Sequence, residues 1–277
     1  FLGKSTSIVG VSGTAHLYDS LMQAACRNGR VAEVGYDTRL NVEKLLALQP
    51  NVVFAYGVSG EFSSVAAKLE EVGLRVVYIG EYTEQHPLGK TEWAVAMAAF
   101  WGCESEAIAR FAEVEEVYIG LKKMVDTMPK VKALLNAPWG DAWYLPGAHG
   151  YAACLLNDAG GASAIPLREH RDSYPLSIEQ ACRKAQQATV WLNAGQAKNL
   201  HELQAMHKLV EEIPAFREGN VYNNNARLSP HGGSDFFDSG TVCPHLILKD
   251  IIKILHPQLL PDYTMTYYQK LKMKNEK

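Results

Sequence analysis

Several motifs of common enzyme classes are missing from this sequence. No G-x-G-x-x-G follows a predicted strand and no G-x-x-x-x-G-K-[ST] occurs, so the glycine-rich phosphate sites of dinucleotide-binding and P-loop proteins are absent. Gly57-Val-Ser-Gly60 lacks the spacing of a nucleophile elbow. His201-Glu202 matches the first half of a zinc-binding H-E-x-x-H helix, but the next histidine, His207, falls off the shared face. We therefore expect no enzymatic activity, no catalytic residues and no metal bound by the protein's own side chains.

Basic runs, long apolar runs and paired cysteines are also absent. Lysine plus arginine number 27 against 30 acidic residues, with no basic cluster, so nucleic acid is not an expected partner. The longest apolar run, 93–101, is far below the roughly 20 residues that cross a bilayer. The 5 cysteines lie far apart without a C-x-x-C pair, which favours buried thiols over a disulfide framework. No signal segment is visible, and a start at Phe1 rather than Met is expected for a trimmed export precursor.

The chain does contain alternating strand and helix patterns in both halves. Short β-branched or apolar runs at 52–55, 75–79, 131–135 and 189–192 are each separated by helical patterns. This alternation predicts an α/β fold of two Rossmann-like lobes, each with a parallel sheet. We expect an N-terminal α/β lobe over 1–86, a helical segment over 87–129, and a C-terminal α/β lobe over 130–277.

One long amphipathic helix is predicted between the two halves, from Glu104 to Met128. Acidic residues open it, Lys122 and Lys123 close it, and Pro129 ends it. Such a helix is about 37 Å long and would join the two lobes as a strut, the alternative being a helix packed on one sheet. Its apolar stripe is expected to comprise Ile108, Phe111, Val114, Tyr118, Leu121, Val125 and Met128.

The two halves share one local pattern. Leu40-Asn41-Val42-Glu43 opens a helix that precedes the strand at 52–55, and Leu176-Ser177-Ile178-Glu179 opens a helix that precedes the strand at 189–192. Each helix has a capping residue and an acid in its first turn. The similar spacing favours duplicated lobes over chance likeness of two βα units.

Aromatic residues gather in or near the predicted loops at the carboxyl ends of strands. Parallel α/β sheets bind ligands at that edge, and aromatic walls suit a large flat or apolar ligand. Residues 137–147 are expected to form one such loop, dense in aromatics, glycine and proline. The aromatic residues in question are Tyr36, Tyr56, Tyr82, Trp139, Trp143, Tyr144, Tyr174 and Phe236.

Residues 41–54 (NVEKLLALQPNVVF) closely resemble the N-x-E-x-(I/L)-x-A-L-x-P-D-(L/V)-(V/I) signature of periplasmic binding proteins for iron-siderophores, haem and vitamin B12. The resemblance continues in the family's order over almost the whole chain. Further matching segments are 73–77 (GLRVV), 86–93 (HPLGKTEW), 158–161 (DAGG), 176–180 (LSIEQ) and 235–240 (DFFDSG). The family's fold is two α/β lobes joined by one rigid helix.

The resemblance implies a role in transport. The protein would capture a metal chelate of the iron-siderophore, haem or cobalamin type and deliver it to an ABC permease with its ATPase, acting as a monomer. It would be periplasmic or attached to the cell envelope by a lipid, with no cofactor of its own because the metal belongs to the transported ligand. Glu43 and Glu179 match the glutamates that dock onto permease arginines in this family.

The resemblance also implies ligand-binding positions. Arginines often bind anionic chelates in this family, and the candidate here is Arg227 in the long loop, with His149 and Asp235 as accompanying residues. Ser239 stands where the vitamin B12 binder has an arginine, which puts corrinoid specificity in doubt. The expected aromatic contacts are Tyr36, Tyr56, Trp139, Tyr144, Tyr174 and Phe236.

Other functions remain open from the sequence. A free zinc or manganese binding protein of an ABC importer would need converging histidines and carboxylates. An enzyme on a two-lobed α/β scaffold would need a cofactor site or a reactive pair. A ligand-free interaction protein would have no affinity in the cleft.

Overall fold

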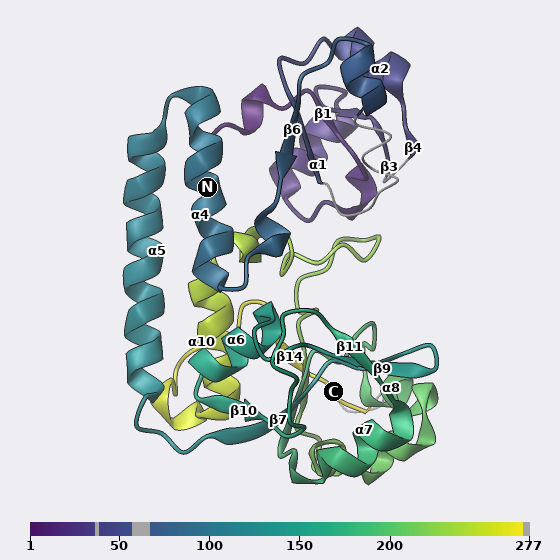
Figure 1. Ribbon diagram of the computed structural model, residues 1–277, viewed down its shortest axis with the longest axis vertical. Coiled ribbons are helices and arrows are strands. Elements are labelled where there is room, and N and C mark those ends of the chain that lie inside the picture. Colours follow the sequence, from purple (N-terminus) through teal and green to yellow (C-terminus); the bar gives the residue numbers. More distant parts are fainter. Residues whose placement is uncertain (37–38, 57–66, 274–277) are drawn as a thin grey trace.

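The computed structural model describes residues 1–36, 39–56 and 67–273. Two groups of strands lie at opposite ends of the molecule, and helices α4 (Pro87–Ala98) and α5 (Glu104–Val125) run along one side (Figure 1). The expected α/β fold with two lobes and one long connecting helix is confirmed. Gly57-Val-Ser-Gly60, which lacks the spacing of a nucleophile elbow, and residues 61–66 after it lie outside the described residues.

The N-terminal lobe contains short strand pairs. β1 pairs with β2 and β5 with β6, both in parallel, whereas β3 and β4 form an antiparallel pair. Helices on these strands, among them the described helical residues 67–71, pack through small apolar clusters. The elements are β1 (Gly10–Val11), α1 (Ser20–Arg27), β2 (Ala32–Glu33), β3 (Gly35–Tyr36), β4 (Arg39–Leu40), α2 (Val42–Leu48), β5 (Val53–Tyr56) and β6 (Val76–Ile79).

The C-terminal lobe is built on a five-stranded sheet in the order β10-β7-β12-β13-β14. Neighbouring strands are parallel except at β13–β14. The strands are β7 (Val131–Leu135), β10 (Gly161–Ser163), β12 (Val190–Leu192), β13 (Val221–Asn223) and β14 (Gln269–Lys270). The helices are α6 (Tyr151–Asp158), α7 (Ile178–Lys184), α8 (Leu200–Met206), α9 (Pro214–Arg217) and α10 (Pro244–Leu255).

Both faces of this sheet are buried. Leu134 and Trp191 point into a core shared with α7, α8 and α9. Leu135 and Leu192 point to the opposite face, into a core shared with α5, α6 and α10. Burial on both faces explains why neighbouring residues of β7 and β12, such as Leu134 with Leu135 and Trp191 with Leu192, are all apolar and do not alternate with polar residues.

Residues 137–147, predicted as a loop, instead form part of an antiparallel sheet. β8 (Pro138–Trp139) and β9 (Ala142–Leu145) make a hairpin, and β11 (Tyr174–Ser177) pairs with the other edge of β9. Gly140 takes φ +56° in the turn, a conformation that glycine adopts without strain. The loop prediction was wrong because proline and glycine hid the alternation of buried Trp143 and Leu145 with exposed Tyr144.

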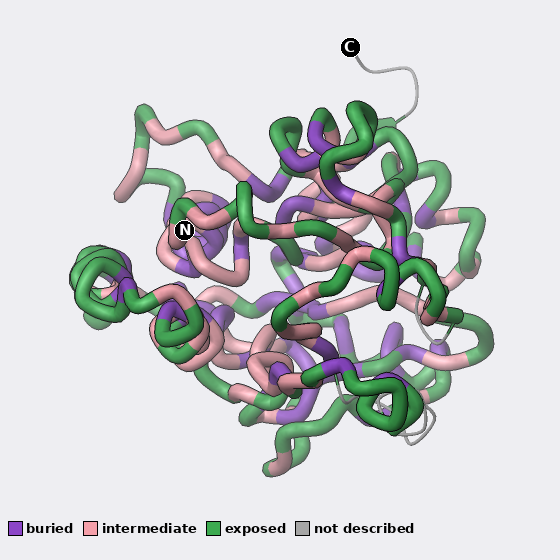
Figure 2. The backbone as a smooth tube through the Cα atoms, turned by 90° about the horizontal axis from the view of Figure 1, so that it is seen from above, coloured by how far each residue is buried: buried purple, intermediate pink, exposed green. Residues whose placement is uncertain are grey.

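Helix α5 has 22 residues, which gives a length of about 33 Å. It packs against α4 and α10, and Figure 2 shows the helix at the left edge exposed on its outer side. The predicted stripe is correct at Val114, Tyr118, Leu121 and Val125, which are buried. It is wrong at Ile108, which is 55% exposed, because small Ala107 takes the buried position beside Ala98 of α4.

One buried carboxylate links α4, α5 and α6 near the C-terminal end of α5. Asp158, at the end of α6, is 5% exposed and accepts a hydrogen bond from the Tyr118 hydroxyl at 2.9 Å. Lys122 Nζ lies 2.8 Å from it, and His86 Nε2, at the start of α4, lies 3.4 Å away. Burial raises the pKa of Asp158, but the hydrogen bonds from His86, Lys122 and Tyr118 outweigh it and hold the pKa below its ordinary value.

Asp158→Asn is expected to lower the free energy of unfolding at neutral pH by about 2 kcal/mol, because charge-assisted bonds to the carboxylate are lost. A carboxyl group whose pKa is lower in the folded than in the unfolded protein stabilises the folded state at pH values above its unfolded pKa. This stabilisation is lost as the pH falls through the pKa of the folded protein. The variant should therefore lose less stability than the wild type as the pH falls below the ordinary pKa of an aspartate. Urea unfolding at a series of pH values measures this, and exposed Asp141→Asn is the matched control. Parallel pH profiles for wild type and Asp158→Asn would contradict the assignment.

Candidate functional site

The carboxyl ends of β7 and β12 carry two asparagines in an unusual backbone conformation. Asn136 has φ +64° and Asn193 has φ +62°, in the left-handed region that asparagine tolerates better than most residues. β10 and β12 flank β7 on opposite sides. After β7 the chain first adds β10 on one side and later crosses over to add β12 on the other, so the strand order reverses at β7. Such a switch point is where open α/β sheets bind ligands.

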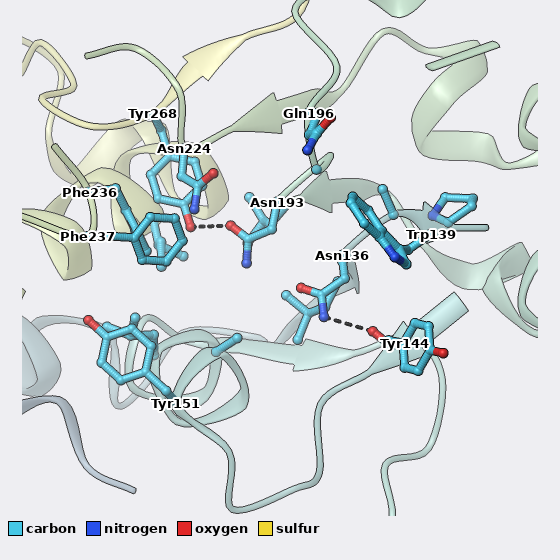
Figure 3. A pocket seen from close by; sticks show the side chains of 18 of the residues that line it. Asn136, Trp139, Tyr144, Tyr151, Asn193, Gln196, Asn224, Phe236, Phe237 and Tyr268 are labelled. Atoms are coloured by element: carbon cyan, nitrogen blue, oxygen red, sulfur yellow. Dashed lines mark hydrogen bonds between the residues drawn. The ribbon is translucent and has the colours of Figure 1, made fainter. Parts of the chain in front are cut away.

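A pocket of about 610 Å³ opens at this point (Figure 3). Its floor comes from β7 and β12, and its walls come from the β8–β9 hairpin, α6, the segment at 235–238 and the chain before β14. Trp139 and Phe237 lie at opposite ends of the pocket in Figure 3 and are 67% and 70% exposed. The aromatic lining residues are Trp139, Tyr144, Tyr151, Phe236, Phe237 and Tyr268, and the amide-bearing ones are Asn136, Asn193, Gln196 and Asn224.

Hydrogen bonds fix the amides on the floor. The Tyr268 hydroxyl donates to Asn193 Oδ1 at 2.6 Å, and Asn136 Nδ2 donates to the Tyr144 carbonyl at 2.8 Å. Trp191 Nε1 donates to the Asn136 carbonyl at 2.7 Å. Burial raises the pKa of Tyr268, which therefore stays a neutral donor at physiological pH. These groups are held in place before any ligand arrives.

A second carboxylate supports this wall of the pocket from behind. Asp250 on α10 is fully buried and accepts backbone N–H groups from Thr266, Tyr267 and Tyr268 at 2.9, 2.6 and 3.0 Å. The Tyr263 hydroxyl donates to it at 2.7 Å. Asp250 therefore fixes the segment that presents Tyr268 to the pocket.

The structure brings together three of the predicted ligand residues, Trp139, Tyr144 and Phe236, in this pocket. Tyr36 and Tyr56 lie in the N-terminal lobe and are 61% and 52% exposed. The pKa of Tyr56 is raised to about 12 by burial and by the Glu81 carboxylate, which accepts a hydrogen bond from the Tyr56 hydroxyl. Tyr174 is buried under Arg168, whose guanidinium carbon lies 4.4 Å from the ring centroid, and does not line the pocket.

Arg227 and Asp235 line a different hollow, of about 660 Å³, between the two lobes. Arg227 Nε lies 2.8 Å from Asp235 Oδ2, but its N–H does not point at that oxygen, so the contact is an ion pair and not a hydrogen bond. The guanidinium also lies over the ring of Tyr18, 5.0 Å from its centroid. The Tyr18 backbone N–H donates to Asp238 at 3.1 Å. The segment at 235–238 therefore faces the aromatic pocket with its phenylalanines and the N-terminal lobe with its carboxylates.

Arg227→Ala is expected to destabilise the protein by about 2 kcal/mol, because Asp235 is 3% exposed and would lose its counter-charge. Adding Asp235→Asn in the same chain should recover most of the loss, since the buried charge is then gone. Denaturant unfolding of the two variants measures the difference. A double variant no more stable than Arg227→Ala alone would show that the ion pair is not what holds Asp235.

The pocket residues that the sequence did not single out include Asn136, Asn193, Phe237 and Tyr268. Asn193 opens a loop that follows a predicted strand, and Phe237 follows Phe236, so the sequence positions of both could have indicated that they lie at the ligand site. Tyr268 lies 75 residues from Asn193 and gave no such signal.

Glu43 and Glu179 occupy equivalent local structures. Each lies in the first turn of a helix that follows a strand of an antiparallel pair, β4 or β11, and each is exposed. Asn41 caps α2 through a bond from the Lys44 N–H at 2.9 Å, and Ser177 caps α7 through a bond from the Gln180 N–H at 3.2 Å. Hydrogen bonds from its own backbone N–H and from Ser177 lower the pKa of Glu179, so it is ionised at neutral pH.

Two kinds of feature are absent from the described part of the chain. No group of three or more His, Cys, Asp or Glu side chains there is arranged to hold a metal ion. No described helix has the length and apolar character needed to cross a bilayer.

Comparison with known proteins gives consistent matches. A family model described as periplasmic binding protein matches residues 1–228. An uncharacterized lipoprotein of Methanocaldococcus jannaschii is 26% identical over 251 residues, covering 89% of this chain and 58% of the lipoprotein. A second from the same organism is 25% identical over 258 residues, covering 88% and 62%. The chain thus spans less than two thirds of the length of these relatives.

Solved structures match over almost the whole chain. The periplasmic haem-binding protein HutB of Vibrio cholerae superposes with a TM-score of 0.69 at 19% identity, covering 92% of this chain and 93% of that one. A possible iron-binding periplasmic solute-binding protein of Staphylococcus epidermidis gives 0.70 at 15% identity, covering 92% of both chains. A periplasmic haem-binding protein of Pseudomonas aeruginosa gives 0.69 at 18% identity, covering 92% and 87%. At these identities the likeness establishes the fold, and with the family match it follows that this chain belongs to the periplasmic binding protein family.

Proposed function

We propose that this protein is the substrate-binding component of an ABC importer and that it captures a metal chelate for delivery to the membrane permease. The observation that carries the proposal is the preformed aromatic pocket at the carboxyl ends of β7 and β12. Its volume of about 610 Å³ is in the range of small-molecule sites, and its exposed aromatic rings offer flat surfaces for a macrocycle or chelate. Two of the structural neighbours are described as haem-binding proteins, which supports this ligand type.

The route to the membrane is argued from the two exposed glutamates. Glu43 and Glu179 project from equivalent helix starts, one in each lobe. Paired negative charges at two separated points orient a partner that carries complementary cations. We take this partner to be a permease with its own ATPase, to which the protein docks as a monomer. The lipoprotein relatives support a lipid anchor in the cell envelope.

Binding is expected to require little lobe movement. α5 packs on α4 and α10, and Asp158 ties α4, α5 and α6 together. The segment at 227–240 also reaches the N-terminal lobe, where Ser229 donates to the Ala15 carbonyl at 3.3 Å and a Cβ on Gly233 would clash with the backbone of His16. A chelate would then be held mainly by stacking and by amides already in position.

Titration of the purified protein with haemin, cyanocobalamin and ferric siderophores tests the proposal. Trp139 lies at the pocket, so a bound chromophore should quench tryptophan fluorescence with a saturating, one-to-one curve. Saturation by at least one chelate, but not by free Fe³⁺, Zn²⁺ or Mn²⁺, is the expected result. Saturation by a free metal ion alone would favour the free-metal alternative and overturn the proposal.

A further inference from the structure

The aromatic pocket carries no formal charge among its described lining residues. None of the 19 is aspartate, glutamate, lysine, arginine or histidine. The pKa values of Tyr151 and Tyr268 are both raised by burial, so neither supplies a phenolate at neutral pH. The polar groups offered to a ligand are amides and phenols.

The amides are arranged to accept and to donate. The bonds to Tyr268 and to the Tyr144 carbonyl use one atom of each floor amide. Among the described residues, Asn193 Nδ2 and Asn136 Oδ1 make no hydrogen bond with the protein, which leaves the Asn193 NH2 group as a donor and the Asn136 side-chain carbonyl as an acceptor on the pocket floor. Gln196 and Asn224 add further amides along the lining.

The nearby cations are engaged outside the pocket. The ammonium of Lys90 on α4 lies over the ring of Tyr151, with its Nζ 4.7 Å from the ring centroid, and Lys90 is not among the lining residues. Arg227 is paired with Asp235 in the hollow between the lobes. Residues 37–38 and 57–66, outside the described part, contain no lysine, arginine or histidine in the sequence, and the whole chain has a net charge of -3.

An anionic ligand would therefore lose its hydration in this pocket without gaining a counter-charge, which is strongly unfavourable. A neutral ligand with amide or hydroxamate groups would exchange hydrogen bonds with water for bonds to Asn136 and Asn193. We infer that the pocket selects a chelate whose enclosed surface is uncharged, such as an amide-rimmed corrinoid or a neutral tris-hydroxamate, over multiply anionic catecholates and carboxylate-bearing porphyrins. This inference rests on the proposed function and specifies its substrate class.

The test compares four probes in the same fluorescence titration: cyanocobalamin, a neutral ferric tris-hydroxamate, a ferric tris-catecholate and haemin. At least one of the two neutral probes should bind about 100-fold more tightly than either anionic probe, as expected for an uncompensated buried charge. Equal or tighter binding of the tris-catecholate or haemin would overturn the inference while leaving the proposed function intact. Binding of none of the four by folded protein would overturn the proposed function and the inference with it.

A charge placed in the pocket gives a second test. Gln196 is an exposed lining residue, so Gln196→Arg should raise affinity for the ferric tris-catecholate about 10-fold and thereby reduce the preference for the neutral probes over this anionic probe. Gln187→Arg adds the same charge at an exposed site outside the pocket and should change neither affinity. A Gln196→Arg variant with no gain for the anionic probe would show that missing positive charge is not what sets selectivity.

Discussion

Replacing both Glu43 and Glu179 with lysine is expected to reduce chelate import by at least about 100-fold while chelate affinity stays within about 2-fold of wild type. Both glutamates are exposed in the first turn of a helix and neither lines the pocket, so the change removes a docking contact without altering the binding site. Uptake of labelled chelate in the native host, with the variant in place of the wild-type gene, measures the first quantity. Fluorescence titration of the purified variant measures the second.

Glu104→Lys with Glu106→Lys is the matched control. These residues are also exposed and lie in the first turn of α5, so the charge change and helix context are the same. The control should import normally. Equal loss of import in both double variants would mean that net charge, and not docking at these positions, is responsible.

Removing the two exposed rings of the pocket is expected to weaken chelate binding about 100-fold. Trp139→Ala and Phe237→Ala each delete a ring that becomes covered only when a ligand binds, and each should cost about 10-fold in affinity. Because the rings are 67% and 70% exposed in the free protein, thermal stability should change little. Titration and thermal unfolding of the double variant separate the two effects.

Tyr78→Ala is the control for this pair, since Tyr78 is exposed on β6 and does not line the pocket. It should bind the chelate normally. Unchanged affinity in the Trp139 and Phe237 double variant would place the ligand elsewhere, and the hollow lined by Arg227 and Asp235 would be the next candidate.

The parts of the fold that were predictable are those with strong local signals. β7 at Val131–Leu135 has the predicted bounds, and α5 begins at Glu104 as expected. Apolar periodicity and flanking proline define such elements without long-range information. The β8–β9 hairpin was missed because pairing with β11 decides its structure, and that strand lies some 30 residues away in the chain.

The candidate site was predictable only in outline. Trp139, Tyr144 and Phe236 stand out as aromatic residues next to strand ends, and the rule for parallel sheets places them at one edge. The hydrogen bond from Tyr268 to Asn193 and the pairing of Arg227 with Asp235 depend on tertiary packing, which no local pattern encodes. The expected contribution of Tyr174 to the ligand site remains a prediction, and its burial under Arg168 means that a ligand would have to displace side chains to reach it.

Native mass spectrometry of the protein with a chelate panel, comparing wild type with the Trp139 and Phe237 double variant, tests the central claim most directly. A mass increase of one intact chelate, metal included, in the wild type and its loss in the variant is the predicted result. An increase corresponding to a bare metal ion, or an intact chelate retained equally by both proteins, would contradict the account of a chelate receptor built on this pocket.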